Sequence, residues 1–338
     1  MSVERILWEE DAAGVADLVR KGEVSAVELT DAAIARAEAT RPDINATAEP
    51  LYDAARARAK TVDPSLPLAG VPFAIKDLGI AIRGVPTHGG SRIPAWLADV
   101  NSVLTDRYLA AGLIPIVTST SPEHGLRLMT ESRAFGITRN PWNTGHTSGG
   151  SSGGSAALVA AGVVPVAHAS DGGGSIRVPA ACTGLVGLKT SRGRTPLTPL
   201  VSESWYGMVV DHALTRSVRD CALLLDLTHG SDPLSPYAAP PPKGTFAAAA
   251  ARDPGKLSLA VYRKSPLGLP PLACGAMDPK GADELIENLL DKLHLTPLLK
   301  LKPFFGQLMD KSLWFTHWPA IQNVSGQPSI ALPVHVTD

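Results

Sequence analysis

The sequence predicts an α/β fold, in which helices alternate with the short buried strands of a central sheet. Three short apolar runs carry this prediction, at residues 70–77, 113–117 and 163–169. Each run has the length of a strand, and stretches with the composition of helices separate them. This alternation is typical of domains in which helices are layered on a sheet.

The composition is that of a chain with a large hydrophobic core. The 338 residues are 44 % hydrophobic and 19 % charged, whereas about a quarter of residues are charged in an average domain. The 31 basic and 32 acidic side chains give a net charge of −1. A chain without a dominant charge is not expected to bind nucleic acid or an anionic membrane. The length corresponds to one large domain or two modest ones.

The N-terminus carries charges where a signal peptide needs an apolar core, and no run approaches 18 apolar residues. A cytoplasmic protein is therefore expected. The three cysteines, Cys182, Cys221 and Cys274, include no CxxC pair, so neither a disulfide framework nor a zinc site is expected.

Two helices are expected near the N-terminus. Ser25 and Glu28 have the spacing of a capping box, in which each side chain accepts a hydrogen bond from the other residue's backbone N–H. The alanine-rich stretch that follows ends at Arg41 and Pro42, where the helix is expected to stop. A second helix is expected over residues 51–60.

Later elements are expected from the same kinds of pattern. Further helices are expected at residues 102–111, 155–161 and 214–227. The last of these carries a second capping box, formed by Ser217 and Asp220. Residues 233–254 contain three consecutive prolines and five consecutive alanines and are expected to be a surface linker. Weaker patterns indicate a strand at 257–262, a helix at 282–293 and a strand at 329–336.

Two glycine- and serine-rich segments, at residues 145–155 and 170–179, dominate the middle of the chain. A flexible linker is a poor interpretation, because both segments lie between core elements. Neither segment has the spacing of a nucleotide-binding loop. Residues 150–154 fit the GxSxG pattern of a nucleophile elbow, but that motif requires a hydrophobic strand before it, and residues 139–148 are rich in turn-forming residues.

Ser175 is the better candidate for a nucleophile. Three glycines precede it, so successive backbone N–H groups can point to one place, as an oxyanion hole requires. Lys76 is a candidate base, because it ends an apolar run and burial lowers the pKa of a lysine. A lysine at the end of a strand more often extends into solvent, however.

Several ordered motifs resemble those of the amidase signature family of serine hydrolases. They are GVPFAIKDL at 70–78, TRNPWN at 138–143, GGSSGGS at 149–155, DGGGSIRVPA at 171–180, GLVGLKTSRGR at 184–194 and NVSGQPSIALP at 323–333. Within the family the chain looks most similar to bacterial 6-aminohexanoate-cyclic-dimer hydrolases and their aryl acylamidase and urethanase relatives. The implied fold is a mixed central β-sheet flanked by helices on both faces.

The resemblance also implies a Ser–cis-Ser–Lys triad. Ser175 matches the nucleophile that forms the acyl-enzyme, Ser151 matches the serine after a cis peptide bond that relays the proton, and Lys76 matches the general base. The backbone N–H groups that match the oxyanion hole belong to Gly172, Gly173 and Gly174.

Other polar residues near these motifs are expected to have supporting roles. Asp171 and Arg177 flank the nucleophile and are expected to brace its loop. Ser152 is expected either to hold the glycine-rich loop or to cap the helix that follows. The four histidines at 88, 124, 146 and 168 lack the spacing of a metal site, so they are not expected to bind a metal. The chemistry of the implied triad requires no metal or organic cofactor, and none is expected.

The resemblance extends from the N-terminal helices to about residue 228 and resumes near residue 320. We therefore expect one amidase-signature domain over residues 1–338. Its parts are a helical region at 1–65, a catalytic core at 66–228, a variable region at 229–319 and a C-terminal core strand at 320–338. Residues 265–319 match poorly, and family members continue beyond the last motif with a further strand and helix. The chain is thus expected to be truncated or shown incompletely.

The function implied by the resemblance is hydrolysis of a carboxamide, cyclic amide, anilide or carbamate through an acyl-enzyme on Ser175. Two alternatives stay open: a glutamine-amidase subunit of a tRNA amidotransferase, and a non-catalytic truncated homologue that binds a ligand. The expected partner is a small-molecule amide or carbamate, with no nucleic acid and no membrane. A homodimer also stays open.

Overall fold

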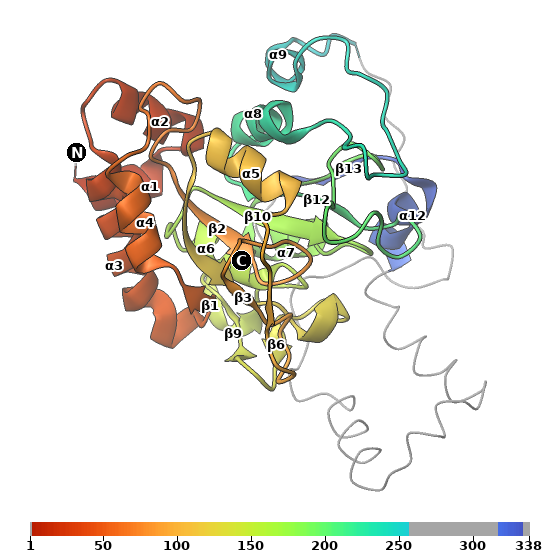
Figure 1. The fold of residues 1–338 in the computed structure, drawn as a ribbon, viewed down its shortest axis with the longest axis horizontal. Coiled ribbons are helices and arrows are strands. Elements are labelled where there is room, and N and C mark those ends of the chain that lie inside the picture. Colours follow the sequence, from red (N-terminus) through yellow and green to blue (C-terminus); the bar gives the residue numbers. More distant parts are fainter. Residues whose placement is uncertain (1, 257–316, 334–338) are drawn as a thin grey trace, which may run out of the picture.

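A mixed sheet of seven strands forms the centre of the structure, a computed structural model that describes residues 2–256 and 317–333 (Figure 1). The strand order is β1-β5-β2-β10-β12-β11-β13. Their bounds are β1 Thr47–Pro50, β2 Pro72–Lys76, β5 Ile114–Ser119, β10 Val166–Asp171, β11 Val186–Lys189, β12 Val210–Thr215 and β13 Ser329–Ala331. Strand β2 is parallel to β5 and β10, and the other neighbours are antiparallel. The expected α/β fold with a mixed sheet is confirmed.

Helices cover this sheet. Their bounds are α1 Val3–Glu9, α2 Ala12–Arg20, α3 Ala26–Ile44, α4 Tyr52–Ala59, α5 Val103–Ala110, α6 Gly153–Ala160, α7 Arg177–Thr183, α8 Val218–Thr228, α9 Phe246–Ala251 and α12 His317–Ser325. Helices α3 and α4 lie at the end of the sheet formed by β1, and α5 lies beside α8 (Figure 1). Helix α6 packs on β2 and β10, and every residue in it is buried. Its small side chains allow this close packing.

Within the described residues, three short antiparallel strand pairs lie outside the central sheet. They are β3 (Pro86–Thr87) with β4 (Trp96–Leu97), β6 (Glu131–Ser132) with β7 (Gly136–Ile137), and β8 (Arg139–Asn140) with β9 (Asn143–Thr147). A 3-10 turn, η1 (Glu123–Gly125), lies between β5 and β6 in the chain. The TRNPWN motif is thus the turn of a hairpin.

The predicted N-terminal helices are confirmed. The capping box of Ser25 and Glu28 begins α3, with both reciprocal hydrogen bonds present. The helix continues past Pro42 to Ile44, two residues beyond the predicted stop. A proline in the last turn removes only one intrahelical hydrogen bond, and Asn45 closes the helix in a left-handed conformation.

The boundary predicted at residue 214 is wrong. Leu214 lies in β12, and the helix expected over 214–227 begins at Val218. Strand β12 was not expected, because Asp211 and His212 interrupt its apolar pattern, yet both are buried there. Strands β1 and β11 were also missed. Because β1 joins the sheet, the N-terminal region is not purely helical.

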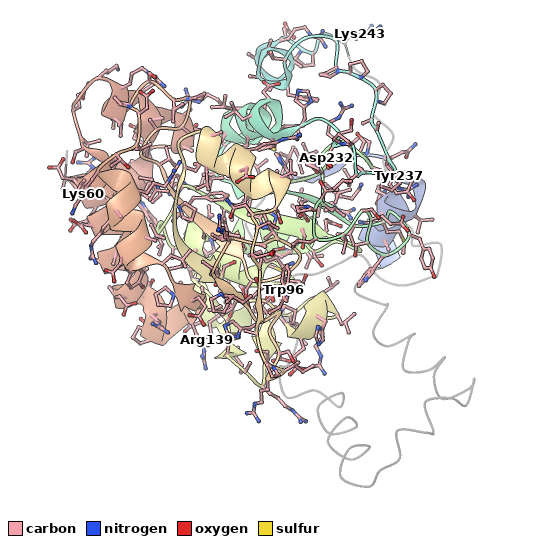
Figure 2. All side chains as sticks on the ribbon, in the orientation of Figure 1. Lys60, Trp96, Arg139, Asp232, Tyr237 and Lys243 are labelled. Atoms are coloured by element: carbon pink, nitrogen blue, oxygen red, sulfur yellow. The ribbon has the colours of Figure 1, made fainter. Side chains whose placement is uncertain are left out.

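Residues 233–254 lie at the surface, as predicted for the linker, but they include the short helix α9. The labelled side chains Tyr237 and Lys243 follow this segment in Figure 2. The expected strand at 257–262, the expected helix at 282–293 and the end of the expected strand at 329–336 lie outside the described residues. Cys221 is buried as a free thiol, Cys182 is half-buried, and Cys274 is outside the described residues. The division into parts of one domain stays a prediction.

The second predicted capping box is half correct. The Ser217 hydroxyl accepts a hydrogen bond from the Asp220 N–H at 3.1 Å. The Asp220 carboxylate accepts instead from the N–H groups of Ala12 and Ala13, at 2.6 and 3.0 Å. Asp220 therefore caps the N-terminus of α2, more than 200 positions earlier in the chain.

Replacing Asp220 with alanine removes both acceptors and leaves two backbone N–H groups without partners. We expect Asp220→Ala to lower the free energy of unfolding by about 1–3 kcal/mol. Urea denaturation measures this loss. Asp53→Ala is the control, because the Asp53 side chain is fully exposed. An equal effect of the two substitutions would contradict this role for Asp220.

Candidate active site

Lys76 ends β2 in the middle of the sheet, and its side chain is 1 % exposed. The amine donates hydrogen bonds to the Ser151 hydroxyl at 2.7 Å and to the Ser170 hydroxyl at 2.8 Å. Burial lowers the pKa of Lys76 to about 7, although the carboxylates of Asp211 and Asp171 oppose this shift. The lysine does not extend into solvent, and its amine can be neutral near neutral pH.

The loop that carries Ser151 depends on its glycines. Gly149 has a φ of +79°, and a Cβ there would lie 2.8 Å from the Cα of Pro179 at the start of α7. A Cβ on Gly154 would lie 2.4 Å from the backbone oxygen of Thr120. The loop is therefore packed tightly between two elements, which a flexible linker would not be. The peptide bond between Gly150 and Ser151 is cis.

Ser175 follows the three glycines and precedes α7, and it is 7 % exposed. It lines the same cavity as Ser151 and Ser170. Within the described residues its hydroxyl makes no hydrogen bond, while its backbone oxygen accepts from the Ser152 N–H at 3.3 Å. The structure therefore joins Lys76 to Ser151 directly and places Ser175 on the wall of their shared cavity.

The three glycines before Ser175 do not have equivalent N–H groups. The N–H of Gly174 donates to Asp171 Oδ1 at 2.8 Å, so in this structure it does not face the cavity as predicted for an oxyanion hole. The N–H groups of Gly172, Gly173 and Ser175 make no hydrogen bonds to the part of the chain that the structure describes. Ser175 is thus a further candidate donor that the sequence reasoning missed.

Asp171 and Arg177 brace the loop, as the sequence suggested. Two nitrogens of Arg177 donate to the two carboxylate oxygens of Asp171, each at 2.9 Å. Burial alone would raise the pKa of Asp171, but the hydrogen bonds from Arg177 hold it below its ordinary value. Asn323, on α12, also donates to Asp171 Oδ1 at 2.9 Å. No role in the site was expected for Asn323, although it lies in the last of the quoted motifs.

Ser152 holds the loop rather than capping α6. Its hydroxyl donates to the backbone oxygen of Ser170 at 3.2 Å and accepts from the Ser170 N–H at 3.3 Å, and it makes no capping hydrogen bond. Ser170, which contacts the Lys76 amine and lines the cavity, is a further candidate functional residue that was not predicted. Its position directly before Asp171, at the end of an apolar run, was the available signal.

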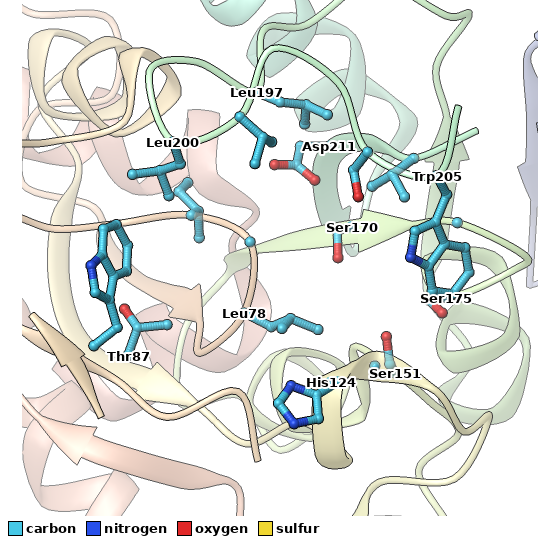
Figure 3. A pocket seen from close by; sticks show the side chains of 18 residues that line it. Leu78, Thr87, His124, Ser151, Ser170, Ser175, Leu197, Leu200, Trp205 and Asp211 are labelled. Atoms are coloured by element: carbon cyan, nitrogen blue, oxygen red, sulfur yellow. The ribbon is translucent and has the colours of Figure 1, made fainter. Parts of the chain in front are cut away.

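A cavity of about 520 Å³ opens beside these residues (Figure 3). Its walls are largely apolar and include two tryptophans, Trp96 and Trp205. Trp96 is near the centre of the view in Figure 2 and is half exposed. The lining consists of Leu78, Gly79, Ile80, Thr87, Trp96, His124, Gly125, Ser151, Ser170, Gly172, Ser175, Leu197, Leu200, Val201, Ser204, Trp205, Val209 and Asp211. No lysine or arginine occurs among these described lining residues.

The four histidines at 88, 124, 146 and 168 do not form a metal-binding cluster within the described residues. His88 contacts Glu49 at 2.7 Å, and His168 is fully buried beside Asp211. Among the residues that the structure describes, no cluster of three or more histidine, cysteine or acidic side chains is arranged to hold a metal ion. In the same part of the chain, no helix is both long and apolar enough to cross a membrane.

Comparison with known proteins agrees with this geometry. A family model described as Amidase matches residues 28–287. The 6-aminohexanoate-cyclic-dimer hydrolase of Paenarthrobacter ureafaciens is 41 % identical over 267 residues, which are 78 % of this chain and 54 % of that protein. The chain therefore spans about half the length of this relative.

Solved structures show the same relationship. A 6-aminohexanoate cyclic dimer hydrolase complexed with substrate matches with a TM-score of 0.74 and 39 % identity, over 86 % of this chain and 60 % of that one. A bacterial aryl acylamidase matches with a TM-score of 0.65 and 35 % identity, over 71 % and 51 % of the two chains. Because the family model covers most of the sequence and the fold agrees, the chain belongs to the amidase signature family.

Proposed function

We propose that this chain hydrolyses an amide bond through an acyl-enzyme on Ser175. The observation that carries the proposal is the buried amine of Lys76, 2.7 Å from the Ser151 hydroxyl, beside the cavity that Ser175 also lines. A lysine whose pKa is lowered to about 7 by burial is matched to proton transfer near neutral pH.

The relay consists of two proton transfers among three groups. Neutral Lys76 takes the proton of the Ser151 hydroxyl, and Ser151 takes that of Ser175, whose oxygen attacks the carbonyl carbon. The N–H groups of Gly172 and Gly173 stabilise the negative charge on the carbonyl oxygen. The proton then returns through Ser151 to the leaving nitrogen as the C–N bond breaks. Water repeats the sequence on the acyl-enzyme and releases the acid.

The cavity favours an uncharged substrate with apolar groups on either side of the amide. Its walls carry leucine, valine and tryptophan side chains, and the described lining has no cation to hold the α-carboxylate of glutamine. This favours an anilide, cyclic amide or carbamate over the glutamine-amidase alternative. The small-molecule partner, the cytoplasmic location and the state of assembly remain predictions.

A serine-directed fluorophosphonate tests the nucleophile. We expect one adduct on the unmodified chain, no adduct on Ser175→Ala, and labelling slowed at least about 100-fold in Ser151→Ala and Lys76→Ala, since general base assistance contributes about that much or more. Intact mass spectrometry against time gives the rates. Ser204→Ala is the matched control, because Ser204 lines the same cavity outside the relay, and it should label at the original rate. An adduct on Ser175→Ala would refute the assignment.

The pH dependence of labelling tests the base. Because the folded-state pKa of Lys76 is lowered, its amine becomes neutral as the pH rises through about 7. The labelling rate should therefore rise about tenfold per pH unit below pH 7 and level off above it. Lys189 is a second buried lysine, and its pKa is lowered to about 8 by burial. Lys189→Met should keep the profile, whereas Lys76→Arg should abolish its rise. If Lys189→Met shifts the pH profile of the labelling rate, Lys76 is not the base.

Substrate class is tested with the purified chain alone. We expect release of aniline from a neutral acyl anilide, because both products fit apolar walls, and no release of ammonia from glutamine. Chromatography of the products measures both reactions, with Ser175→Ala as the blank. Glutamine turnover without anilide turnover would favour the amidotransferase alternative. Saturable anilide binding without any product would favour a ligand-binding homologue.

A further inference from the structure

A carboxylate that acts on the Lys76 amine lies on β12, which is separated from β2 by β10. Asp211 on β12 is directly opposite Ser170 on β10 in the antiparallel register. Facing residues in such a pair have Cβ atoms about 4.5–5.5 Å apart. Ser170 is in turn hydrogen-bonded to Lys76 at 2.8 Å. Ser170 thus contacts Lys76 directly and lies opposite Asp211 in the strand register, and Figure 3 shows Ser170 and Asp211 in the same view of the cavity.

Asp211 is buried without the partners that a buried carboxylate normally has. Its side chain is 3 % exposed, and within the described residues Oδ1 is buried and makes no hydrogen bond. Oδ2 lies 3.5 Å from Nε2 of His168, which is fully buried two positions before Ser170 on β10. A buried charge without hydrogen bonds lowers the free energy of unfolding. A group that is kept in such an arrangement is a candidate for a functional role.

Other groups around Lys76 differ from Asp211. Asp171, at the end of β10, is held by the two hydrogen bonds from Arg177. Asp77 follows Lys76 in the chain, and its Oδ1 accepts a hydrogen bond from the N–H of His88 at 2.8 Å. His168 comes from β10, and His124 of η1 lines the cavity. Asp77 Oδ2 is also buried without a hydrogen bond within the described residues, but the carboxylates that act on the pKa of Lys76 are those of Asp211 and Asp171. Of these two, Asp211 has no ion pair with a lysine or arginine within the described residues.

We propose that Asp211 is a positioning residue that supplies the counter-charge for the ammonium formed on Lys76 when the relay protonates it, and that His168 holds Asp211 in place. The proposal rests on the proposed function of the relay. It adds Asp211 and His168 to the residues on which proton transfer depends, although neither belongs to the triad.

The physical reason is the cost of forming a cation in the core. Lys76 is neutral when it acts as a base and positive after it has taken the proton, and the buried positive form is strongly disfavoured without a nearby anion. A carboxylate hydrogen-bonded directly to the amine would stabilise the ammonium so well that the lysine stayed protonated at neutral pH. An anion that does not contact the amine directly lowers the free-energy cost of forming the buried ammonium and still allows the neutral amine to exist. The Asp211 carboxylate accordingly raises the pKa of Lys76 against the larger effect of burial.

The test compares Asp211→Asn with the unmodified chain, using the fluorophosphonate labelling rate as a function of pH. Without the anion the ammonium is less stable, so the acid limb should move to lower pH by about one unit. The rate on the plateau should fall at least about tenfold, since proton transfer to Lys76 becomes harder. A general loss of structure lowers the rate without moving the acid limb downward.

Matched variants separate the electrostatic role from packing. Asp220→Asn removes a buried carboxylate that caps α2 elsewhere, and it should leave the acid limb in place. Asp211→Glu keeps the charge and should retain the midpoint of the unmodified chain. If Asp211→Asn does not fold, Asp211→Ser is the second neutral variant, with the same expected shift.

An acid limb that stays in place or moves to higher pH in the folded neutral variants would overturn the proposal. A shift of equal size in Asp220→Asn would also overturn it. If the unmodified chain does not label at Ser175, the proposed function itself fails, and that result is distinguishable because it precedes any comparison of variants.

Discussion

The site depends on one physical constraint, which is the burial of a lysine amine in the centre of the sheet. Lys76 has no access to water, so its polar atoms must find partners inside the protein. The hydroxyls of Ser151 and Ser170 are those partners. They come from a glycine-rich loop and from the neighbouring strand, so both elements must lie close to the end of β2. The same burial makes the amine a base near neutral pH.

The loops that carry the serines are held by a polar network of their own. Asp171 joins Arg177, the N–H of Gly174 and Asn323, and a carboxylate that accepts so many hydrogen bonds is stabilised in its charged form. Asn323 belongs to α12, which is far from the other residues in sequence. The network therefore ties the C-terminal part of the described chain to the loop before Ser175. The loop's geometry depends on distant segments being in place.

The cavity places apolar walls beside this polar network. Leucine and tryptophan side chains line the space next to Ser175, and electrostatic interactions are stronger in apolar surroundings than in water. Apolar surroundings also make an unpaired charge costly. The position of Asp211 opposite Ser170 is therefore important for the free energy of the charged groups in the site. Apolar walls and a small number of buried charges thus act together on the reacting groups.

The features that depend on neighbours along the chain could be predicted from the sequence alone. Periodicity, helix caps and turns are local patterns, so they can be recognised in the sequence. These patterns predicted the buried strand that ends at Lys76, the capping box at Ser25 and the glycine-rich motifs around Ser151 and Ser175. Contacts between side chains on different strands, or with distant helices, became apparent only from the three-dimensional structure. Strand β12 was missed because its polar residues face a buried site rather than water, and the orientation of the Gly174 N–H was decided by the Asp171 carboxylate. Strand register and long-range hydrogen bonds set these contacts, and neither has a local signature in the sequence.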